Sequence, residues 1–194
     1  MIILTELEQQ ILEQATPLLK NGRPGDLEHT LRVVDLGLRL AAGEKADRGM
    51  IAPALLLHDI GWSQVDCARF LDAPMAKAPF SREALLHQEI GAEMAGLILE
   101  GLKVPPALVA RITRYIAVHD QPDLVRAGPD FDARICFEAD YLDRFGADGR
   151  GRWNAMMGAR LREDHLRELL DQGREKWFGS PSALLVLKNK LEEL

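Results

Sequence analysis

The sequence predicts an all-α fold, and three observations support that prediction. Apolar residues recur every three to four positions along most of the chain, no convincing run alternates β-branched with polar residues, and capping residues, glycines and prolines separate the periodic stretches. The 194 residues are 47% hydrophobic and 28% charged, which is typical of a globular protein. We therefore expect a single domain over residues 1–194, with a helical core at about 20–146 and a C-terminal helical extension at 147–194.

The first two helices are expected near the N-terminus. Apolar spacing predicts a helix over Leu4–Leu19, which the Asn-Gly pair after it would close. Asp26 is a suitable N-cap for a second helix that runs to about Ala42, with Gly43 just beyond its end. Apolar residues occupy two faces of this second helix, so it should be a central helix with neighbours on both sides.

A third helix is expected over Asp47–Ile60, where Gly61 would stop it. Residues 62–80 then form a long, partly irregular segment, and such a segment in a compact domain is often a lid or a binding loop. Besides a loop over Gln121–Pro129, the later sequence predicts helices over Arg82–Glu100 (capped by Ser81), Pro105–His119, Phe131–Phe145, Trp153–Leu170 and Pro181–Leu194.

Charge, cysteine content and hydropathy exclude several classes of protein. The longest apolar runs are far too short to span a bilayer, and the N-terminus lacks the basic start and apolar block of a signal peptide. Cys67 and Cys136 form no disulfide framework, so we expect ordinary buried thiols and a cytoplasmic protein. The net charge of −6 argues against broad binding to a nucleic-acid duplex, but not against one short phosphorylated substrate.

Four of the five histidines fall at helix positions that should face inward. His58 and Asp59 directly follow an apolar run, an unusual place for a carboxylate, because a buried charge is costly unless it is paired or binds a metal. A second inward carboxylate is expected at Asp140. The other inward histidines are His29, His87 and His119, whereas His165 lies in the charged stretch "REDHLRE" and should face solvent.

Two interpretations of these residues compete. A single inward histidine is more often a hydrogen-bonded core residue than a ligand, and Asp140 could instead cap a helix or pair with Arg144. However, four histidines and two aspartates on five separate helices are difficult to explain as independent features of a core. A shared metal site explains all six, because Zn, Fe, Mn, Co and Ni accept imidazole and carboxylate ligands. The helix must then end or bend at His58 and Asp59 for both to reach one ion.

The order of these residues resembles a known family. His29, then His58-Asp59, then Asp140 matches the H…HD…D pattern of the HD-domain metal-dependent phosphohydrolases, an all-α superfamily. The stretches "EHTLRVVDLGLRLA", "ALLLHDIGW" and "EADYLDRFG" are similar to that superfamily, over about residues 20–146. His87 and His119 resemble the additional ligands of its two-metal branches. The resemblance implies an HD-domain helical bundle with additional C-terminal helices.

The resemblance also implies that the ligands hold two divalent transition-metal ions (Fe, Mn, Co, Ni or Zn). Two ions about 3.5–4 Å apart can share a hydroxide for in-line attack on phosphorus and can bind the leaving oxygen. Asp59 would bridge the two ions and would be a catalytic residue. The implied ligand sets are His29, His58, Asp59 and Asp140 for the first ion, and Asp59, His87 and His119 for the second.

A basic side chain should stabilise the negative charge that develops on the attacked phosphoryl group. Arg144, one turn after Asp140, is the first candidate for this catalytic role, and Arg32 and Lys77 are weaker candidates. For each of them a surface charge is the more common role. Trp62 stands where many hydrolytic relatives carry lysine, and it would serve as a core anchor or as a stacking surface for a base or sugar.

Three functions are compatible with these residues. The first is a phosphohydrolase that cleaves a phosphoester or phosphoanhydride of a small metabolite or nucleotide. Cleavage of cyclic dinucleotides is not supported, because that branch carries a doubled histidine and a Gly-Tyr-Pro stretch that this chain lacks. The second is a mixed-valence di-iron oxygenase of the same superfamily, since the same ligands suit iron. The third is a non-catalytic nucleotide-binding module, against which the complete ligand set argues.

The remaining predictions concern partners. We expect a small phosphorylated substrate or nucleotide as the partner, with no nucleic-acid duplex and no membrane. The sequence is compatible with a homodimer without requiring one. Four large residues should pack the C-terminal helices onto the core or onto a second copy of the chain, namely Trp153, Met156, Met157 and Trp177.

Overall fold

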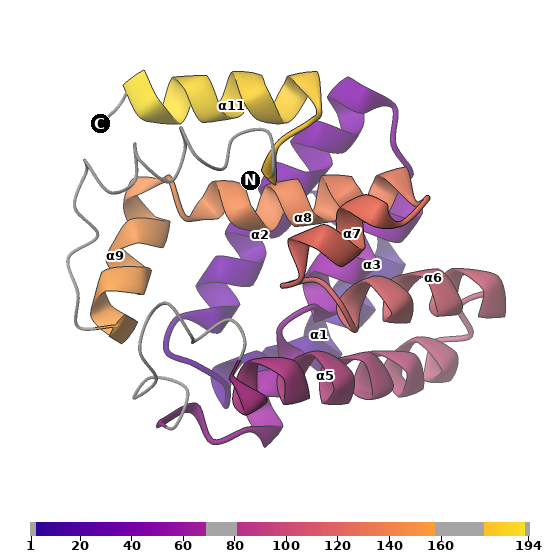
Figure 1. Cartoon of the computed structure of the whole chain (residues 1–194). Helices are drawn as coiled ribbons and strands as arrows, with labels where there is room; N and C mark the ends of the chain where they lie inside the picture. The colour runs from indigo at the N-terminus through magenta and orange to yellow at the C-terminus, as the bar shows by residue number, and fades with distance from the viewer. Residues whose placement is uncertain (1–2, 69–80, 158–176, 193–194) are drawn as a thin grey trace.

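Helices make up the regular structure of the protein. The computed structural model describes residues 3–68, 81–157 and 177–192, and within these ranges it contains helices but no strand (Figure 1). The prediction of an all-α fold is therefore confirmed. The elements are α1 (Glu6–Lys20), α2 (Asp26–Glu44), α3 (Arg48–Leu57), the 3-10 helix η1 (Ile60–Gln64), α5 (Arg82–Gly101), α6 (Pro106–Ile116), α7 (Pro122–Ala127), α8 (Phe131–Asp143), α9 (Ala147–Met157) and α11 (Pro181–Glu192).

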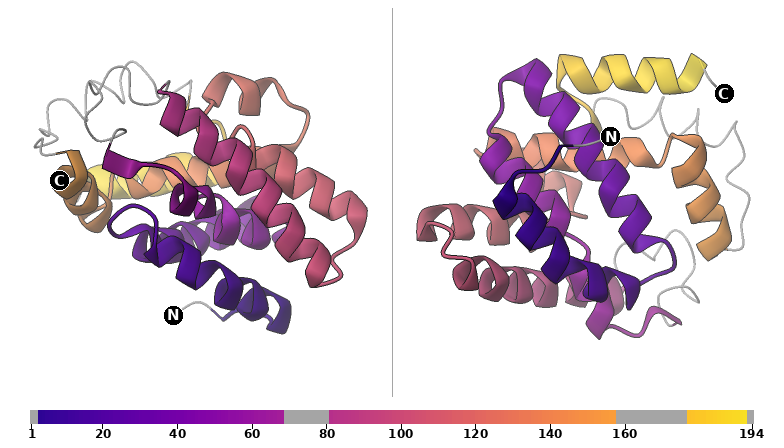
Figure 2. Two further views of the ribbon diagram at one scale, coloured as in Figure 1. Left: turned by 90° about the horizontal axis from the view of Figure 1, so that it is seen from below. Right: turned by 180° about the vertical axis from the view of Figure 1, so that it is seen from behind.

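The central helix is α2, as its two apolar faces predict. It packs against α8 and α3, and α1 and α11 also contact it (Figures 1 and 2). Val33, Val34 and Leu40 of α2 are fully buried. Burying one such side chain contributes about 1.5–3 kcal/mol to the free energy of folding, so this helix is a major source of core stability.

The other helices lie on opposite sides of this centre. Figure 1 shows α5 and α6 side by side on one side of the bundle and α11 on the other, where α11 contacts α2 and α8. The 3-10 helix η1 packs against α5 and α1. These contacts bring helices that are far apart in the sequence next to one another.

The helix starts agree only in part with the prediction. Ser81 caps α5, as expected, by accepting a hydrogen bond from a backbone N–H. Asp26 is not the N-cap of α2, because Gly25 holds that position with a φ of 76° and Asp26 is the first helical residue. The Asp26 carboxylate instead accepts a 2.7 Å hydrogen bond from the Arg23 backbone N–H. Gly43, expected beyond the helix, lies inside it.

The third predicted helix ends early, at Leu57. The end of this helix sets the directions of the His58 and Asp59 side chains. His58 is the C-cap of α3, and Asp59 is the first residue before η1, so the backbone changes conformation between them. The expectation that the helix ends or bends here is confirmed. Gly61 does not stop α3 but allows a close approach, since a Cβ there would lie 2.0 Å from the His87 carbonyl oxygen. Only glycine lets η1 pack this closely on α5.

Two later segments also differ from the prediction. The helix expected to reach His119 ends at Ile116, so His119 lies in the turns that follow. The predicted loop over Gln121–Pro129 contains the short helix α7, whose first residue, Pro122, suits the first turn of a helix. The helices predicted over 131–145 and 181–194 are present as α8 and α11.

In the C-terminal part of the chain, the structure describes residues 147–157 and 177–192. The helix expected to start at Trp153 begins earlier, at Ala147, and its predicted continuation to residue 170 lies outside the described residues. Trp177 packs onto the core, with its ring 5.6 Å from that of Tyr141, as expected. Three further predictions also fall outside what the structure describes: those for Lys77, for His165 and for the side chains of Met156 and Met157.

A buried carboxylate on α8 fixes the start of α11. Glu138 accepts hydrogen bonds from the Gly179 N–H at 2.6 Å and from the Ser180 N–H at 2.9 Å, and it also accepts one from the Ser180 hydroxyl. A hydrogen bond to a charged group contributes about 1.5–3 kcal/mol. These three bonds offset the burial of the charge and attach the C-terminal helix to α8.

Both cysteines are free; Cys136 is buried, as predicted, whereas Cys67 is only half-buried. Among the described helices, none combines the length and the apolar character that crossing a membrane requires.

Candidate metal centre

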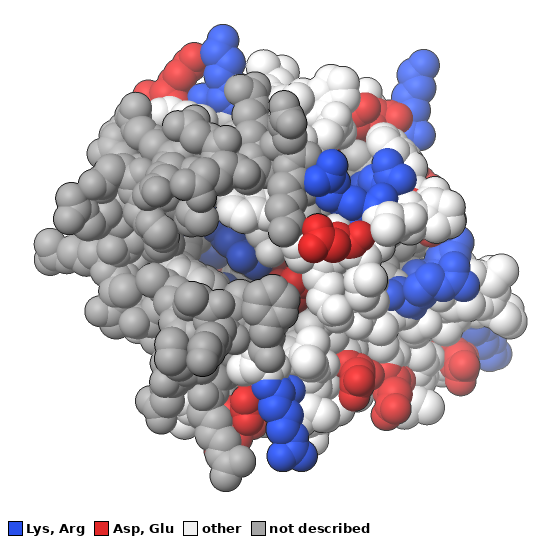
Figure 3. Space-filling model, viewed as in Figure 1, with Lys and Arg blue, Asp and Glu red and all other residues white. Residues whose placement is uncertain are grey.

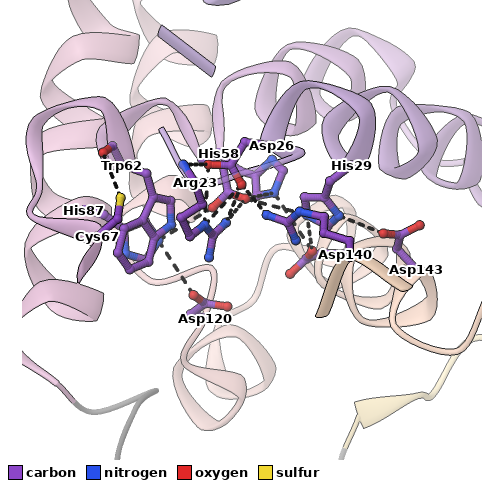
Figure 4. A network of polar contacts seen from close by, with 12 residues as sticks. Arg23, Asp26, His29, His58, Trp62, Cys67, His87, Asp120, Asp140 and Asp143 are labelled. Carbon is purple, nitrogen blue, oxygen red and sulfur yellow. Dashed lines mark hydrogen bonds and ion pairs between the residues drawn. The ribbon is translucent and has the colours of Figure 1, made fainter. Parts of the chain in front are cut away.

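The six predicted ligands converge at one place in the bundle. They come from α2, the α3–η1 junction, α5, the turn after α6, and α8, and each is at most 4% exposed. Figure 4 labels His29, His58, His87 and Asp140 within this network of polar contacts. The described residues contain two groups of three whose potential ligand atoms lie within 4.8 Å of one another, and both groups include Asp59. These groups are His29, His58 and Asp59, and Asp59, His87 and His119.

The first group has the spacing of ligands around a single ion. His29 Nε2 lies 3.1 Å from Asp140 Oδ1 and 3.6 Å from Asp59 Oδ2. His58 Nε2 lies 3.3 Å from the same Asp59 oxygen and 3.9 Å from Asp140 Oδ1. Two ligand atoms that are each 2.0–2.2 Å from one ion are roughly 3–3.5 Å apart. The structure therefore brings Asp140 to the first group, as the sequence predicts.

The second group uses the other oxygen of the shared carboxylate. Asp59 Oδ1 lies 3.8 Å from His87 Nε2 and 3.6 Å from His119 Nε2. The two histidine Nε2 atoms are 3.3 Å apart. Because Asp59 turns one oxygen toward each group, its position is that of a ligand that bridges two ions.

Three of the histidine rings are oriented by hydrogen bonds on their far side. The Nδ1–H groups of His58 and His119 donate to backbone carbonyl oxygens three residues earlier, at 2.7 and 2.8 Å. His29 Nδ1 lies 2.8 Å from Asp143 Oδ2, and both Asp143 oxygens also accept hydrogen bonds from Arg32. Metal-binding histidines typically have such partners, which direct the Nε2 lone pair at the ion.

A buried nitrogen supports the assignment of a cation to this place. His58 Nε2 makes no hydrogen bond to any residue that the structure describes, although the side chain is 1% exposed. A buried polar atom without a hydrogen bond costs about 1–3 kcal/mol. In the neutral form of His58 the proton is on Nδ1, so Nε2 presents a lone pair, which a divalent ion would satisfy. The donor set of imidazoles and carboxylates fits such an ion.

The carboxylates are held in the ionised form that metal binding requires. Burial opposes ionisation of Asp59, but the charges of Arg23 and His58 lower its pKa well below the usual value. Burial likewise opposes ionisation of Asp140, whereas the hydrogen bond from His29 and the charge of Arg144 lower its pKa. Both side chains are therefore anionic at neutral pH.

The two histidines of the second group differ in protonation. Burial and, after it, the charge of His119 lower the pKa of His87 to about 3. Burial also disfavours charged His119, but Asp120 and Asp59 outweigh it and raise its pKa to about 9. Without a metal, His119 is therefore protonated and His87 is neutral at neutral pH.

Arg23 is among the charged residues of the centre that the sequence did not predict. Arg23, in the turn before α2, pairs with Asp59 and with Asp26, and its guanidinium lies 4.4 Å from the ring centre of Trp62. The Trp62 ring stacks on His87 at 4.1 Å, with an angle of 18° between the planes. Trp62 is thus a core anchor, and it supports a cation next to Asp59. The turn sequence "GRPGD" is the signal that could have pointed to this arginine.

The candidate basic residues have different positions. Arg144 lies 3.4 Å from Asp120 and 3.7 Å from Asp140, and its guanidinium sits 3.9 Å from the ring centre of Tyr141. It is only 31% exposed, so it is not a free surface charge. Arg32 does not line the opening of the centre itself, but it binds Asp143, which does.

A hollow of about 360 Å³, a volume that includes open solvent at its mouth, leads to the predicted ligands. In the space-filling view, acidic and basic side chains are visible together in a hollow on this face (Figure 3). The hollow is lined by Arg23, His29, Asp59, Asp120, Asp140, Asp143, Arg144, Gly149, Arg152 and Trp153. Trp153, expected to pack helices together, therefore also contributes to this wall.

The fold and the ligands together define an all-α protein with a candidate binuclear metal centre. The family model described as the HD domain matches residues 26–144, which is more than half of the chain, and the chain belongs to the HD-domain family. This range agrees with the resemblance seen over about residues 20–146.

The comparison with solved structures agrees on the fold. The chain is similar to the crystal structure, at 1.45 Å resolution, of a predicted HD superfamily hydrolase from an uncultured Thermotogales bacterium. The TM-score is 0.64 and the identity 22%, and the match covers 95% of this chain and 85% of the other. Comparison with curated proteins gave no match.

Proposed function

We propose that the protein is a metal-dependent phosphohydrolase that cleaves a phosphoester or phosphoanhydride of a small metabolite or nucleotide. The observation that carries this proposal is the division of one carboxylate, Asp59, between two three-residue ligand groups at the base of a hollow. Two divalent ions bound there would supply Lewis acidity and a water nucleophile activated at neutral pH.

The chain's own residues would prepare this chemistry. Asp59 fixes the spacing between the two groups, because its two oxygens point to different histidines. Asp143 orients His29 through Nδ1 and is itself held by Arg32. These contacts are made before any substrate arrives, so little reorganisation would accompany binding.

Arg144 is the side chain placed to stabilise charge on the substrate. Its guanidinium lines the hollow, close to Asp140, and Asp120 and the Tyr141 ring hold it there. A cation held this way can stabilise the charge that develops on a phosphoryl group. Loss of one such donor typically reduces kcat by about 100- to 1000-fold.

The experiment combines metal analysis with a substrate panel. Protein purified without oxygen is analysed for metals, and phosphate release is then measured from nucleotides and phosphomonoesters with Mn²⁺, Co²⁺, Ni²⁺ or Fe²⁺. We expect metal-dependent phosphate release that Arg144→Gln reduces strongly. The exposed Arg39, which pairs with Asp35 on α2, provides the matched control Arg39→Gln, which should retain wild-type activity.

Two other outcomes would overturn the proposal. Two irons per chain together with oxygen uptake and no phosphate release would indicate the di-iron oxygenase instead. Binding of a nucleotide with neither reaction would indicate the non-catalytic module.

A further inference from the structure

Three arginines face the hollow from three separate elements. Arg23 comes from the turn before α2, Arg144 from the end of α8 and Arg152 from α9. The hollow is also lined by four aspartates, so its wall is close to neutral as it stands. Each divalent ion bound by the ligands would add two positive charges, and the loaded site would then favour an anion.

Two of these arginines compete for the same carboxylate oxygen. Asp26 Oδ1 lies 3.1 Å from both the Arg23 Nε atom and one of its terminal nitrogens, and it also accepts a hydrogen bond from Arg152. The buried Arg152 Nε has no hydrogen-bond partner among the described residues. Burial and the charge of Arg23 lower the pKa of Arg152, although Asp26 and Asp59 raise it. An additional anion would satisfy these donors.

Both side chains are also held in place without a ligand. The Arg23 guanidinium rests on the Trp62 ring, 4.4 Å from its centre. The Arg152 stem packs on Gly25, where a Cβ would lie 3.2 Å from Arg152 Cδ, and the φ of 76° at Gly25 favours glycine. The donors are thus positioned by backbone and ring contacts, which reduces the entropy lost when an anion binds.

We propose that Arg23, Arg144 and Arg152 form a binding cleft for the dianionic phosphate of a small phosphomonoester, in preference to a phosphodiester. This inference rests on the proposed function and names its substrate class. A monoester offers three terminal oxygens and two charges, whereas a diester offers two such oxygens and one charge. Three guanidinium groups match the monoester, because each can donate two parallel hydrogen bonds.

The test measures binding rather than turnover. Isothermal titration calorimetry compares phenylphosphonate, a dianion that mimics a monoester, with its monomethyl ester, which has nearly the same shape and one charge. The titrations use the full chain loaded with Mn²⁺. Wild-type protein should bind the dianion at least tenfold more tightly than the monoanion. Equal affinity for the two probes, or no binding of the dianion, would overturn the inference.

Variants test whether the arginines cause the preference for the dianion. Arg152→Gln should weaken dianion binding at least tenfold, and Arg152→Lys, which keeps the charge but loses the fork geometry, should weaken it less. Arg39→Gln on the exposed face of α2 should bind the dianion like wild type. Circular dichroism confirms that each variant is folded. Wild-type affinity in Arg152→Gln would overturn the role of the cleft.

The two proposals can fail separately. Phosphate release from esters by a protein that binds both probes equally would leave the hydrolase in place and reject the monoester cleft. Arg152-dependent binding of the dianion by a protein that hydrolyses no phosphoester would support the cleft and reject the hydrolase.

Discussion

The two ligand groups share a carboxylate but differ in how their histidines are supported. In the first group, His29 is backed by Asp143 and His58 by a backbone carbonyl oxygen, so both rings have a fixed proton position. In the second group, His119 has such a carbonyl partner, but His87 Nδ1 has no hydrogen bond within the described part of the chain. The His87 ring is held by stacking on Trp62.

This difference predicts that the two ligand groups bind their ions with different affinities. A hydrogen bond on the far nitrogen fixes the tautomer and makes the ligating nitrogen more basic. Stacking fixes only the plane of the ring. We therefore expect the first group to bind its ion tightly and the second to exchange its ion more readily.

The largest effect is expected for the residue common to both groups. Asp59→Ala should remove both ions and reduce activity by more than about 1000-fold, because both oxygens of Asp59 serve as ligands. Elemental analysis and phosphate release measure the two losses, while circular dichroism should show that helical content is retained. Asp66→Ala, at an exposed position seven residues later, is the control and should keep both ions. Full activity of Asp59→Ala would reject the site.

The next largest effect is expected for a ligand that belongs only to the second group, and it should show whether the two groups bind their ions independently. His87→Ala should lower the metal content from two ions to one per chain, since the first group does not contain His87. Activity should fall about 100-fold or more, because one ion cannot bind both the attacking and the leaving oxygen. Loss of both ions in this variant would show that the groups are not independent.

A smaller effect on metal binding is expected from a change at Asp143, the residue that orients His29 in the first group. Asp143→Asn should weaken binding of the first ion by about 10- to 100-fold, because an amide orients His29 less well than a carboxylate does. Titration with Co²⁺, followed by its visible absorption, measures the two affinities. Asp123→Asn, on the exposed surface of α7, should change neither of them. An unchanged first affinity in Asp143→Asn would contradict the comparison.

The smallest effect concerns protons released by the second group. The pKa of His119 is about 9 without metal, so this histidine is protonated at pH 7 and must lose a proton to become a ligand. The apparent affinity for the second ion should therefore rise as the pH increases toward about 9 and level off above it. Calorimetry at pH 7 in two buffers with different ionisation enthalpies measures the release. The same heat in both buffers would contradict the prediction.

The sequence predicted most of the ligands because they belong to periodic helices. His29, His87 and Asp140 lie on α2, α5 and α8, where helical spacing tells which side faces inward. His58 and Asp59 were recognisable because they directly follow an apolar run, where a buried charge is costly unless it is paired or binds a metal. The structure brings these side chains together, and their role as metal ligands stays a prediction that metal analysis can test.

What the sequence did not predict lies mainly in turns. Arg23 and Asp120 follow no helical periodicity, and their positions depend on contacts with Asp59 and Arg144 that are distant in sequence. The helix α7 was missed because a short helix between turn residues gives a weak periodic signal. The end of α3 at Leu57 was also placed too late, since tertiary contacts determine where a helix stops.

The attachment of α11 to α8 has a consequence for local unfolding. Glu138 lies two residues before Asp140, and its carboxylate depends on three donors ahead of α11. Detaching α11 would remove all three donors at once, each of which contributes about 1.5–3 kcal/mol. The two helices should therefore open as one cooperative unit, and their slowest amide hydrogens should exchange with solvent at a common free energy.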